Sequence, residues 1–394
     1  MRTRIAQLAV YIVPLLTAGV SMSCVLLTDF DGLTLDGGVD AADAAESADA
    51  SQADGWDGEV GTEEPGVPVP IASCEGNAWA LAVDGDELFW TSHQVANGTS
   101  SGSKIYKAKL DCRGGACGTE LVFLPASPEL TDIAVDASWV YFGEKRSVGR
   151  ILRVGRNGGT PEVLAEDQAN AFGLAIDSSH VYWTGKDPQQ SGYLRRTYKN
   201  AALDGGGAQA ETLLAELDTP GLLTWDSFSG WLFWGSNAQL AIRKCYPMIL
   251  DGGQSGCEGA TLLASRPDLQ LQPGEMAEVF KLATDQTHVY WREGMYSQGA
   301  PTSGSVRKVA KDGSEQPEIM ADGDPALKPR WISLRGDYAY WTGFDGKVYF
   351  VNKTGGPVEA LNDEPVPGLH SVVALNDAVY VNSWTSCAVY RIPL

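Results

Sequence analysis

One pattern recurs seven times along this chain: a short apolar strand, a polar turn and a second strand that carries aromatic residues. The copies occupy residues 80–91, 132–143, 173–184, 222–235, 281–292, 331–342 and 372–381. Intervals of roughly 40 to 60 residues are typical of blades or of a solenoid. Because each repeat adds its own slab of core, one repeat array fits the 394 residues better than two or three separate domains.

Two columns of the repeat have a structural explanation. The turn residues are Asp84, Asp136, Asp177, Asp226, Asp285, Arg335 and Asn376. A short polar side chain can hydrogen-bond the backbone two residues on, so turn chemistry explains this column better than catalysis. Two positions earlier the residues are Ala82, Ala134, Ala175, Thr224, Ala283, Ser333 and Ala374. Small side chains are needed where the inner strands of a ring of blades converge on its axis.

The strands after the turn complete a blade. Each second strand carries aromatic residues, as in Val181-Tyr182-Trp183, and their fixed place in the repeat favours core over a ligand-stacking platform. Third and fourth strands follow in most copies, for example 149–154 and 161–165, with a hairpin signal at Asn157-Gly158-Gly159 between them. The sequence therefore predicts an all-β fold over residues 67–394, a seven-bladed β-propeller of four-stranded blades.

The seventh copy ends after three strands, which leaves its outer edge open. The segment from Pro68 to Ser73 precedes the first inner strand and can supply the fourth, since prolines are tolerated on an edge strand. We therefore expect the ring to be closed by the N-terminal strand. Cys74 would then lie beside Cys387 and could form a disulfide with it.

The other cysteines also suggest disulfides. With Cys24 set aside, an even number remains, as expected of an exported chain with internal bridges. The repeat register favours two hairpin staples, Cys112 with Cys117 and Cys245 with Cys257. Sequence alone leaves the other pairings open, and metal binding is the alternative use of these thiols.

Residues 1–23 have the three parts of an export signal. Arg2 and Arg4 precede an apolar run at 5–20, and Ser21-Met22-Ser23 leads to Cys24. The pattern resembles a bacterial lipoprotein signal, in which Cys24 becomes the lipidated first residue. Ser21 stands where such signals usually have Leu, so ordinary cleavage and secretion is the alternative. The apolar run is shorter than the roughly 20 residues that span a bilayer, which disfavours an uncleaved anchor.

Residues 24–66 are predicted to be an acidic, disordered tether. Between Val25 and Gly66 there are twelve acidic residues and no basic one. Such a segment has too little apolar surface to offset the entropy of ordering, and its like charges keep it extended. The formal net charge of −21 argues against nucleic acid as a partner, because phosphate binding needs clustered lysine and arginine.

No motif points to catalysis. Gly98-Thr99-Ser100-Ser101-Gly102 matches the Gly-x-Ser-x-Gly pattern of serine hydrolases, but it lies between two strands, and a nucleophile elbow needs a helix after it. No zinc spacing, redox Cys-x-x-Cys or phosphate-cradling glycine loop is present. We therefore assign no catalytic residue, no metal and no cofactor.

The repeats resemble the YWTD and NHL-type β-propeller repeats. The resemblance rests on the triplets Phe89-Trp90-Thr91, Tyr182-Trp183-Thr184 and Tyr340-Trp341-Thr342 and on the turns Leu203-Asp204-Gly205 and Leu250-Asp251-Gly252. It covers residues 67–394. It departs from the family where Ser92, Gly185 and Gly343 replace the final Asp, and the YWTD receptor family typically has six blades where seven are counted here. The shared motifs are structural, so the resemblance implies a fold and no particular function.

A candidate site lies where the inner strands begin. Links between second and third strands, and links between blades, share one face, and the long links 92–103, 264–278 and 293–303 belong to it. Long loops are often functional. The positions expected to ring the axis at this face are Ala80, Asp132, Gly173, Leu222, Lys281, Trp331 and Val372.

Three of these positions break the apolar pattern. These residues are Asp132, Lys281 and Trp331, and their chain neighbours include Trp79, Phe280 and Arg330. Together they predict opposite charges and aromatic surface around one opening. Truncating Lys281 or Trp331 should then weaken ligand binding and leave stability nearly unchanged. The alternative is an ion pair between Asp132 and Lys281 that only plugs the axis.

These features favour a binding or interaction module of the bacterial cell envelope. The chain is expected to be exported and monomeric, attached to the membrane only through a lipid on Cys24, and to reside at the outer membrane or face the periplasm; secretion is the alternative. Its partner would be an envelope protein or an extracellular ligand that the sequence does not identify. The rival function is a propeller-type lyase or hydrolase with its site at the axis, and a purely structural envelope component is a third.

Overall fold

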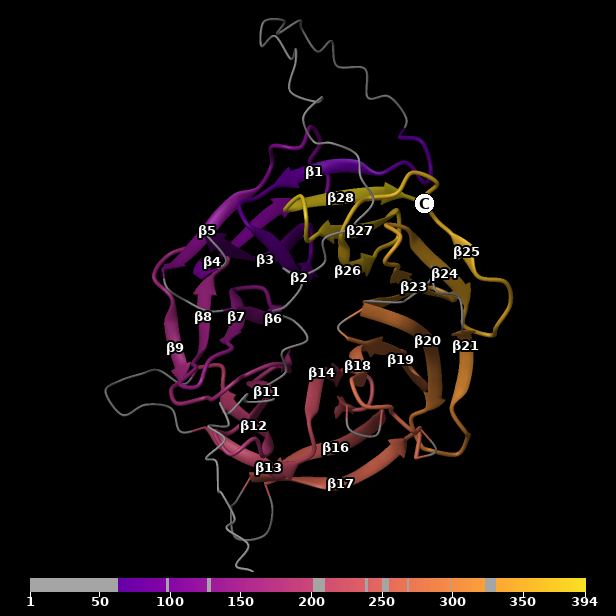
Figure 1. Cartoon of the computed structure of the whole chain (residues 1–394). Helices are drawn as coiled ribbons and strands as arrows, with labels where there is room; N and C mark the ends of the chain where they lie inside the picture. Colours follow the sequence, from indigo (N-terminus) through magenta and orange to yellow (C-terminus); the bar gives the residue numbers. More distant parts are fainter. Residues whose placement is uncertain are drawn as a thin grey trace, which may run out of the picture.

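The computed structural model describes residues 63–394, except 97–98, 126–128, 201–209, 238–239, 250–254, 268, 299 and 323–330. Within these residues, 28 strands form seven antiparallel sheets of four strands each. The sheets stand as blades around one axis (Figure 1). The predicted all-β, seven-bladed propeller is confirmed. The signal segment, Cys24 and most of the acidic segment lie outside the described residues.

The strands of the first four blades follow the chain. Blade 1 consists of β2 (Asn77–Asp84), β3 (Glu87–Ala96), β4 (Thr99–Lys109) and β5 (Thr119–Pro125). Blade 2 consists of β6 (Leu130–Val135), β7 (Trp139–Glu144), β8 (Ile151–Gly155) and β9 (Glu162–Ala165). Blade 3 consists of β10 (Leu174–Ile176), β11 (His180–Lys186), β12 (Gly192–Tyr198) and β13 (Glu211–Leu217). Blade 4 consists of β14 (Pro220–Asp226), β15 (Trp231–Ser236), β16 (Ala241–Ile249) and β17 (Ser255–Ala264).

The last three blades complete the ring. Blade 5 consists of β18 (Glu275–Thr284), β19 (His288–Ser297), β20 (Ala300–Ala310) and β21 (Glu318–Asp322). Blade 6 consists of β22 (Ile332–Arg335), β23 (Tyr338–Thr342), β24 (Val348–Asn352) and β25 (Glu359–Ala360). Blade 7 consists of β26 (Leu369–Ala374), β27 (Ala378–Ser383), β28 (Ala388–Pro393) and the N-terminal strand β1 (Val69–Ser73).

Ring closure follows the sequence prediction. Strand β1 pairs with β28, Val69 lying opposite Arg391, so the two ends of the propeller share blade 7 (Figure 1). A disulfide joins Cys74 to Cys387 at the end of this pairing. The two predicted hairpin staples, Cys112–Cys117 and Cys245–Cys257, are also present.

The aromatic second strands form the cores between blades. Five of their tryptophans are at most 1% exposed: Trp90, Trp183, Trp234, Trp291 and Trp341. Burial of such large apolar side chains contributes much of the stability of the array. The interpretation of these residues as core is confirmed.

The two faces of the ring differ in what they carry. We call upper the face that bears the links between blades and between second and third strands, and lower the face that bears the remaining turns. Two of the long upper links are largely strand: β3 and β4 pair as far as Ala96 and Thr99, and β19 and β20 as far as Ser297 and Ala300. The expectation that they are loops without structure of their own is therefore wrong, because their backbones pair as extended hairpins. Thr99 to Gly102 of the Gly-x-Ser-x-Gly segment belong to strand β4, and Gly98 lies outside the described residues.

Blade 7 corrects the alignment of the repeats. In blade 1, Ala82 of the inner strand pairs with the central aromatic residue Phe89, whereas in blade 7 the equivalent Tyr380 pairs with Val373. The small column therefore contains Val373 instead of Ala374. The axial position of this blade is Ser371, two residues earlier, and Val372 belongs to the neighbouring column.

The turn aspartates of the lower face form a structural clasp between blades. In blade 2, Asp136 Oδ1 accepts the amides of Ser138 and Trp139 at 3.0 Å, as expected of a polar residue that starts a tight turn. Its Oδ2 accepts the hydroxyl of Tyr141 at 2.9 Å and the ammonium of Lys199 from blade 3 at 2.8 Å. The carboxylate thus closes its own turn and ties two blades together.

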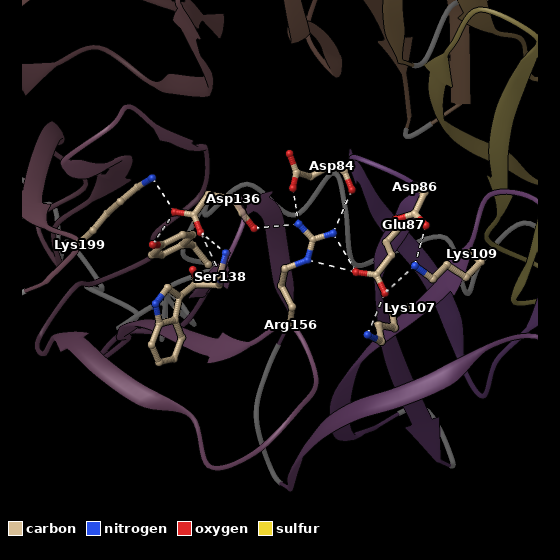
Figure 2. Close-up of polar contacts among 11 residues, drawn as sticks. Asp84, Asp86, Glu87, Lys107, Lys109, Asp136, Ser138, Arg156 and Lys199 are labelled. Atoms are coloured by element: carbon tan, nitrogen blue, oxygen red, sulfur yellow. Dashed lines mark hydrogen bonds and ion pairs between the residues drawn. The ribbon is translucent and has the colours of Figure 1, made fainter.

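The same arrangement recurs around the ring. Arg156 of blade 2 binds Asp84 and Glu87 of blade 1 and donates to the carbonyl of Asp136 at 3.1 Å (Figure 2). Lys311 binds Asp226 at 2.6 Å and Lys353 binds Asp285 at 3.2 Å. The structural interpretation of the aspartate column is confirmed, since its carboxylates serve turns and blade contacts.

Acidification is expected to weaken these clasps. Burial raises the pKa of Asp285, but hydrogen bonds from His288, Thr287 and Tyr290 outweigh it and hold the pKa well below its ordinary value. A carboxyl whose pKa is lowered by folding adds stability above its unfolded pKa of about 4, and this stability is lost as the pH falls towards the folded value. Urea unfolding should therefore show falling stability below about pH 4.

The Asp285→Asn variant tests this cause. Its amide oxygen can still accept the turn amides, while the charge for Lys353 and the acceptor for Tyr290 are lost, which should cost roughly 1 to 3 kcal/mol at neutral pH. Because the variant has one titrating clasp fewer, it should lose less stability than the wild type on acidification. Equal losses in both proteins would show that the clasp does not carry the effect.

Candidate binding site at the upper axis

A bulge near the upper end of the inner strands sets the geometry of the axis. The register of the inner strand shifts by one residue in five blades, at the pairs Trp79-Ala80, Thr131-Asp132, Gly221-Leu222, Phe280-Lys281 and His370-Ser371. A bulge bends the strand and re-aims its side chains. Four of the six candidate site residues therefore leave the ladder at these positions: Trp79, Asp132, Phe280 and Lys281.

Asp132 and Lys281 form an ion pair across the axis. The ammonium of Lys281 lies 3.2 and 3.1 Å from the two carboxylate oxygens of Asp132. These residues come from blades 2 and 5, which are not neighbours, so the pair spans the ring. Asp132 Oδ2 also accepts the amide of Leu174 from blade 3 at 3.1 Å. Asp132 is only 2% exposed, whereas 22% of the Lys281 side chain is exposed.

Aromatic rings continue from this pair. The Lys281 ammonium lies 5.6 Å from the ring centre of Trp331, within the range of a cation–π contact. Trp331 contacts His370 at 5.3 Å between ring centres, and His370 contacts Trp79 at 4.0 Å. We call Asp132, Lys281, Trp331, His370 and Trp79 the axial cluster.

The structure brings together four of the six predicted site residues. Asp132, Lys281, Trp331 and Trp79 belong to the axial cluster, whereas Phe280 turns to a buried arginine, and Arg330 lies outside the described residues. The predicted aromatic surface is not exposed, since Trp79 is 7% and Trp331 3% exposed. Truncating Trp331 would remove core, so its burial predicts a loss of stability where the sequence predicted almost none.

A second network holds neighbouring blades together near the upper ends of the inner strands. Thr91 accepts the amide of Ala80 at 3.1 Å, Thr184 that of Gly173 at 3.0 Å and Thr342 that of Trp331 at 3.4 Å. Each hydroxyl then donates to an inner-strand carbonyl of the next blade, those of Leu130, Gly221 and His370. The threonine of the repeat motif is thus a bridge between blades.

Blade 5 places an arginine at the position of these threonines, where blades 2, 4 and 7 have Gly143, Gly235 and Asn382. The residue at the bridge position is Arg292, which follows the buried Trp291 as Thr91 follows Trp90. Arg292 is 2% exposed, its guanidinium stacks 3.4 Å from the ring centre of Phe280, and both terminal nitrogens donate to the Tyr296 hydroxyl at 3.2 Å. A buried guanidinium is costly unless it is well paired. Its presence in one blade marks that blade as different from the others.

Glu278 adds a buried acid to the same blade. It is 7% exposed, and its Oε2 has no hydrogen-bond partner among the described residues. Burial raises the pKa of Glu278 to about 7, although the positive charges of Arg292 and Lys145 oppose the shift. Burial and the charge of Lys145 also lower the pKa of His93 to about 3, so this imidazole is neutral. The upper end of the axis thus holds a carboxyl that can exchange a proton near neutral pH.

Glu278, Arg292 and His370 were missed from the sequence. Arg292 could have been found, because it stands where the other motif triplets end in threonine. No local signal identifies Glu278, whose burial depends on how β18 and β19 pack. His370 was not predicted at the site, because the alignment placed Val372 at the axial position of blade 7. The residue at that position is Ser371, next to His370.

Two features are absent from the described residues. No group of three or more His, Cys, Asp and Glu side chains among them is placed to hold a metal ion. In the same part of the chain, no helix has the length and apolar character needed to cross a bilayer.

Comparisons with known proteins show the fold. No protein-family model matches the chain, and no curated protein matches it. Among solved structures it is similar to selenomethionine-substituted virginiamycin B lyase from Staphylococcus aureus, with a TM-score of 0.59 and 13% identity over 83% of this chain and 98% of that one. A catalytically inactive variant of that lyase with quinupristin gives a TM-score of 0.56 at 13% identity, with the same coverage. At this identity the likeness shows a shared propeller fold only.

Proposed function

We propose that this protein is an exported, lipid-anchored propeller that binds a ligand at the upper end of its axis. The observation that carries the proposal is the departure of blade 5 from the repeat. Blade 5 places the buried Arg292 where the other blades have Thr91, Gly143, Thr184, Gly235, Thr342 and Asn382, and the same strand pair carries the buried Glu278 and the axial Lys281. Stability alone does not favour such buried charges, whereas recognition of a polar ligand does.

The disulfides support the exported part of the proposal. Three disulfides in one chain are consistent with a compartment outside the cytoplasm. Attachment through Cys24 and a disordered acidic tether at 24–66 are part of the proposal, with residues 1–23 removed as a signal peptide and 67–394 forming the binding domain. The proposal also places the protein at the outer membrane or in the periplasm. There it would act as a monomer on an envelope or extracellular ligand.

The place where the chain enters the ring suggests an orientation for the anchored protein. Glu63 binds Arg113 and Arg391, and Arg391 lies at the lower end of β28. The backbone N–H of Leu394 donates to the carbonyl of Asp377, in a turn of the lower face, at 3.1 Å. A tether that reaches the ring at this face would hold the upper axis away from the membrane.

One experiment tests export, anchoring and binding together. The full chain and its Cys24→Ala variant are produced in a bacterium that processes lipoproteins, and we expect the wild type in the membrane fraction and the variant in the soluble fraction. The soluble full-length variant is then incubated with envelope extract, and retained molecules are identified by mass spectrometry. A soluble wild type without lipid would contradict anchoring.

A matched pair of double variants locates the binding site. Asp132→Asn/Lys281→Gln neutralises both members of the axial ion pair, and Asp285→Asn/Lys353→Gln makes the same change in a lower-face pair. We expect the retained ligand to bind at least tenfold more weakly to the first and within twofold to the second. Equal affinities in all three proteins would place the site elsewhere, and no retained molecule would argue against a binding module.

The second candidate function is an enzyme, and Glu278 favours it. A buried carboxyl with a pKa of about 7 can act as a general acid or base at neutral pH. The capture experiment separates the two functions, because an enzyme would return the molecule chemically altered. A binding module would release it unchanged.

A further inference from the structure

The lower face has one clasp that lacks its cation. Four of the turn aspartates, Asp84, Asp136, Asp226 and Asp285, each bind a lysine or arginine from the following blade. The fifth, Asp177 of blade 3, has only His180 within ion-pair distance among the described residues, 3.6 Å away. The cation expected from blade 4 is therefore missing.

The strand register explains the gap. In blade 3, Thr197 pairs with Val181, and the clasp residue Lys199 stands two positions later. In blade 4, Cys245 holds the place of Thr197, pairing with Leu232, so the clasp position is Pro247. A proline has no cationic side chain to offer. The sequence of blade 4 therefore explains why Asp177 has no clasp cation.

Asp177 is held in place and ionised without that cation. Its Oδ1 accepts the amides of Ser179 and His180 at 2.6 Å, and its Oδ2 accepts the Tyr182 hydroxyl at 2.7 Å. Burial raises the pKa of Asp177, but hydrogen bonds from His180, Tyr182 and the backbone outweigh it and lower the pKa well below the ordinary value. A fixed carboxylate therefore stands where its counterparts meet a positive charge.

A hollow opens beside this carboxylate. It has a volume of about 610 Å³ and is lined by side chains of blades 2, 3 and 4, among them Asp136, Trp139, Asp177, Asn200 and Trp225. Figure 2 shows the blade 2 side of this region, where Lys199 is already bound to Asp136. A hollow of this size is in the range of small-ligand sites.

The walls suit a cation. The ring of Trp225 stacks on Tyr182, the phenol that binds Asp177, with ring centres 5.7 Å apart and planes 5° from parallel. An indole face beside a carboxylate attracts a positive charge both through its quadrupole and through the ion pair. The neighbouring Trp139 already carries a guanidinium, that of Arg153, at 3.9 Å.

We infer that this hollow binds a primary ammonium or guanidinium group, which takes the place at Asp177 that the clasp cation occupies in other blades. The ligand is either a free alkylamine or a lysine or arginine side chain of a peptide, since both present the same group. The hollow lies on the lower face, so it is separate from the axial site. The inference does not depend on the proposed function.

Calorimetric titration of the soluble full-length Cys24→Ala chain tests the inference. The probes are cadaverine and agmatine as free amines, N-acetyl-lysine methylamide as a peptide side chain, and 1,5-pentanediol as the neutral match for cadaverine. We expect the cations to bind and the diol not to bind. Preference for cadaverine or for the lysine derivative distinguishes the two sources.

Two variants identify the site. Pro247→Lys supplies the missing clasp cation from within the chain, so it should weaken cadaverine binding at least tenfold. Ser314→Lys adds the same charge at an exposed lower-face turn of blade 5 and should leave affinity within twofold of the starting chain. Equal binding of the diol, or an unchanged affinity in folded Pro247→Lys, would overturn the inference.

If Pro247→Lys does not fold, the variant Asp177→Asn tests the inference instead. Its amide oxygen can still accept the amides of Ser179 and His180, so the turn is retained while the charge is lost. Cadaverine should again bind at least tenfold more weakly. An affinity equal to that of the starting chain would reject Asp177 as the anion that recognises the ligand.

Discussion

Removing the disulfide between Cys74 and Cys387 is expected to destabilise the propeller by about 5 kcal/mol, because this bond closes the longest loop in the chain. The bonded residues are 313 positions apart, and the bond reinforces blade 7, which is built from both ends of the domain. In the chain-entropy account, a cross-link stabilises by restricting the unfolded chain, and more so for longer loops. The double variant Cys74→Ser/Cys387→Ser should show this loss in urea unfolding, with a thermal midpoint lower by on the order of 10 °C.

The hairpin disulfide of blade 1 is the matched control. Cys112 and Cys117 are five positions apart, so the double serine variant at these positions should lose only roughly 2 kcal/mol. Both variants remove one disulfide and introduce two hydroxyls, and they differ in loop length. Equal losses in the two variants would show that loop closure across the ring does not set the stability.

Replacing Lys281 by alanine is expected to cost roughly 3 to 5 kcal/mol, because it leaves the carboxylate of Asp132 buried without its cation. Asp132 is 2% exposed and cannot recover the lost interaction from solvent. Its remaining partners are the amides of Ile133 and Leu174, at 3.0 and 3.1 Å. Thermal and urea unfolding of the soluble full-length chain measure the effect.

The double variant Asp132→Asn/Lys281→Gln separates the cost of a stranded charge from the value of the pair. With both charges removed, the axis keeps polar side chains of similar size, and the loss should be much smaller than that of Lys281→Ala. A Lys281→Ala protein as stable as the wild type would mean that Asp132 finds water or protonates at little cost. The pair would then be a surface contact and not the plug of the axis.

The two faces divide the tasks of the ring. Lower-face aspartates with a cation, such as Asp136 and Asp285, are saturated by the fold and leave nothing for a ligand. The positions of functional interest are those where a repeated structural contact is absent or altered, Asp177 on the lower face and Arg292 at the upper axis. In a repeat protein the sister blades supply the internal reference against which such departures are recognised.

Many features could be predicted from the sequence because they are set within a few residues. The aspartate turn, the alternation of small and bulky inner-strand residues and the aromatic second strand each depend on local chemistry, and seven copies made them unmistakable. Ring closure also followed, since a three-stranded last copy and an unpaired first segment leave one simple arrangement. The disulfide pairs then followed from the blade register.

Tertiary structure decided what happens where local periodicity fails. The alignment of the blades predicted the ion pair between Asp132 and Lys281 as one alternative, and the structure confirms that the two residues pair. No local pattern shows that both residues leave their ladders at a bulge. The one-residue shift in blade 7 was invisible because Val373 and Ala374 both suit an apolar strand, and only pairing with Tyr380 selects one of them. The charge of Glu278 and the open clasp at Asp177 depend on burial and on neighbouring blades. These are properties of the assembled ring, which a single repeat does not contain.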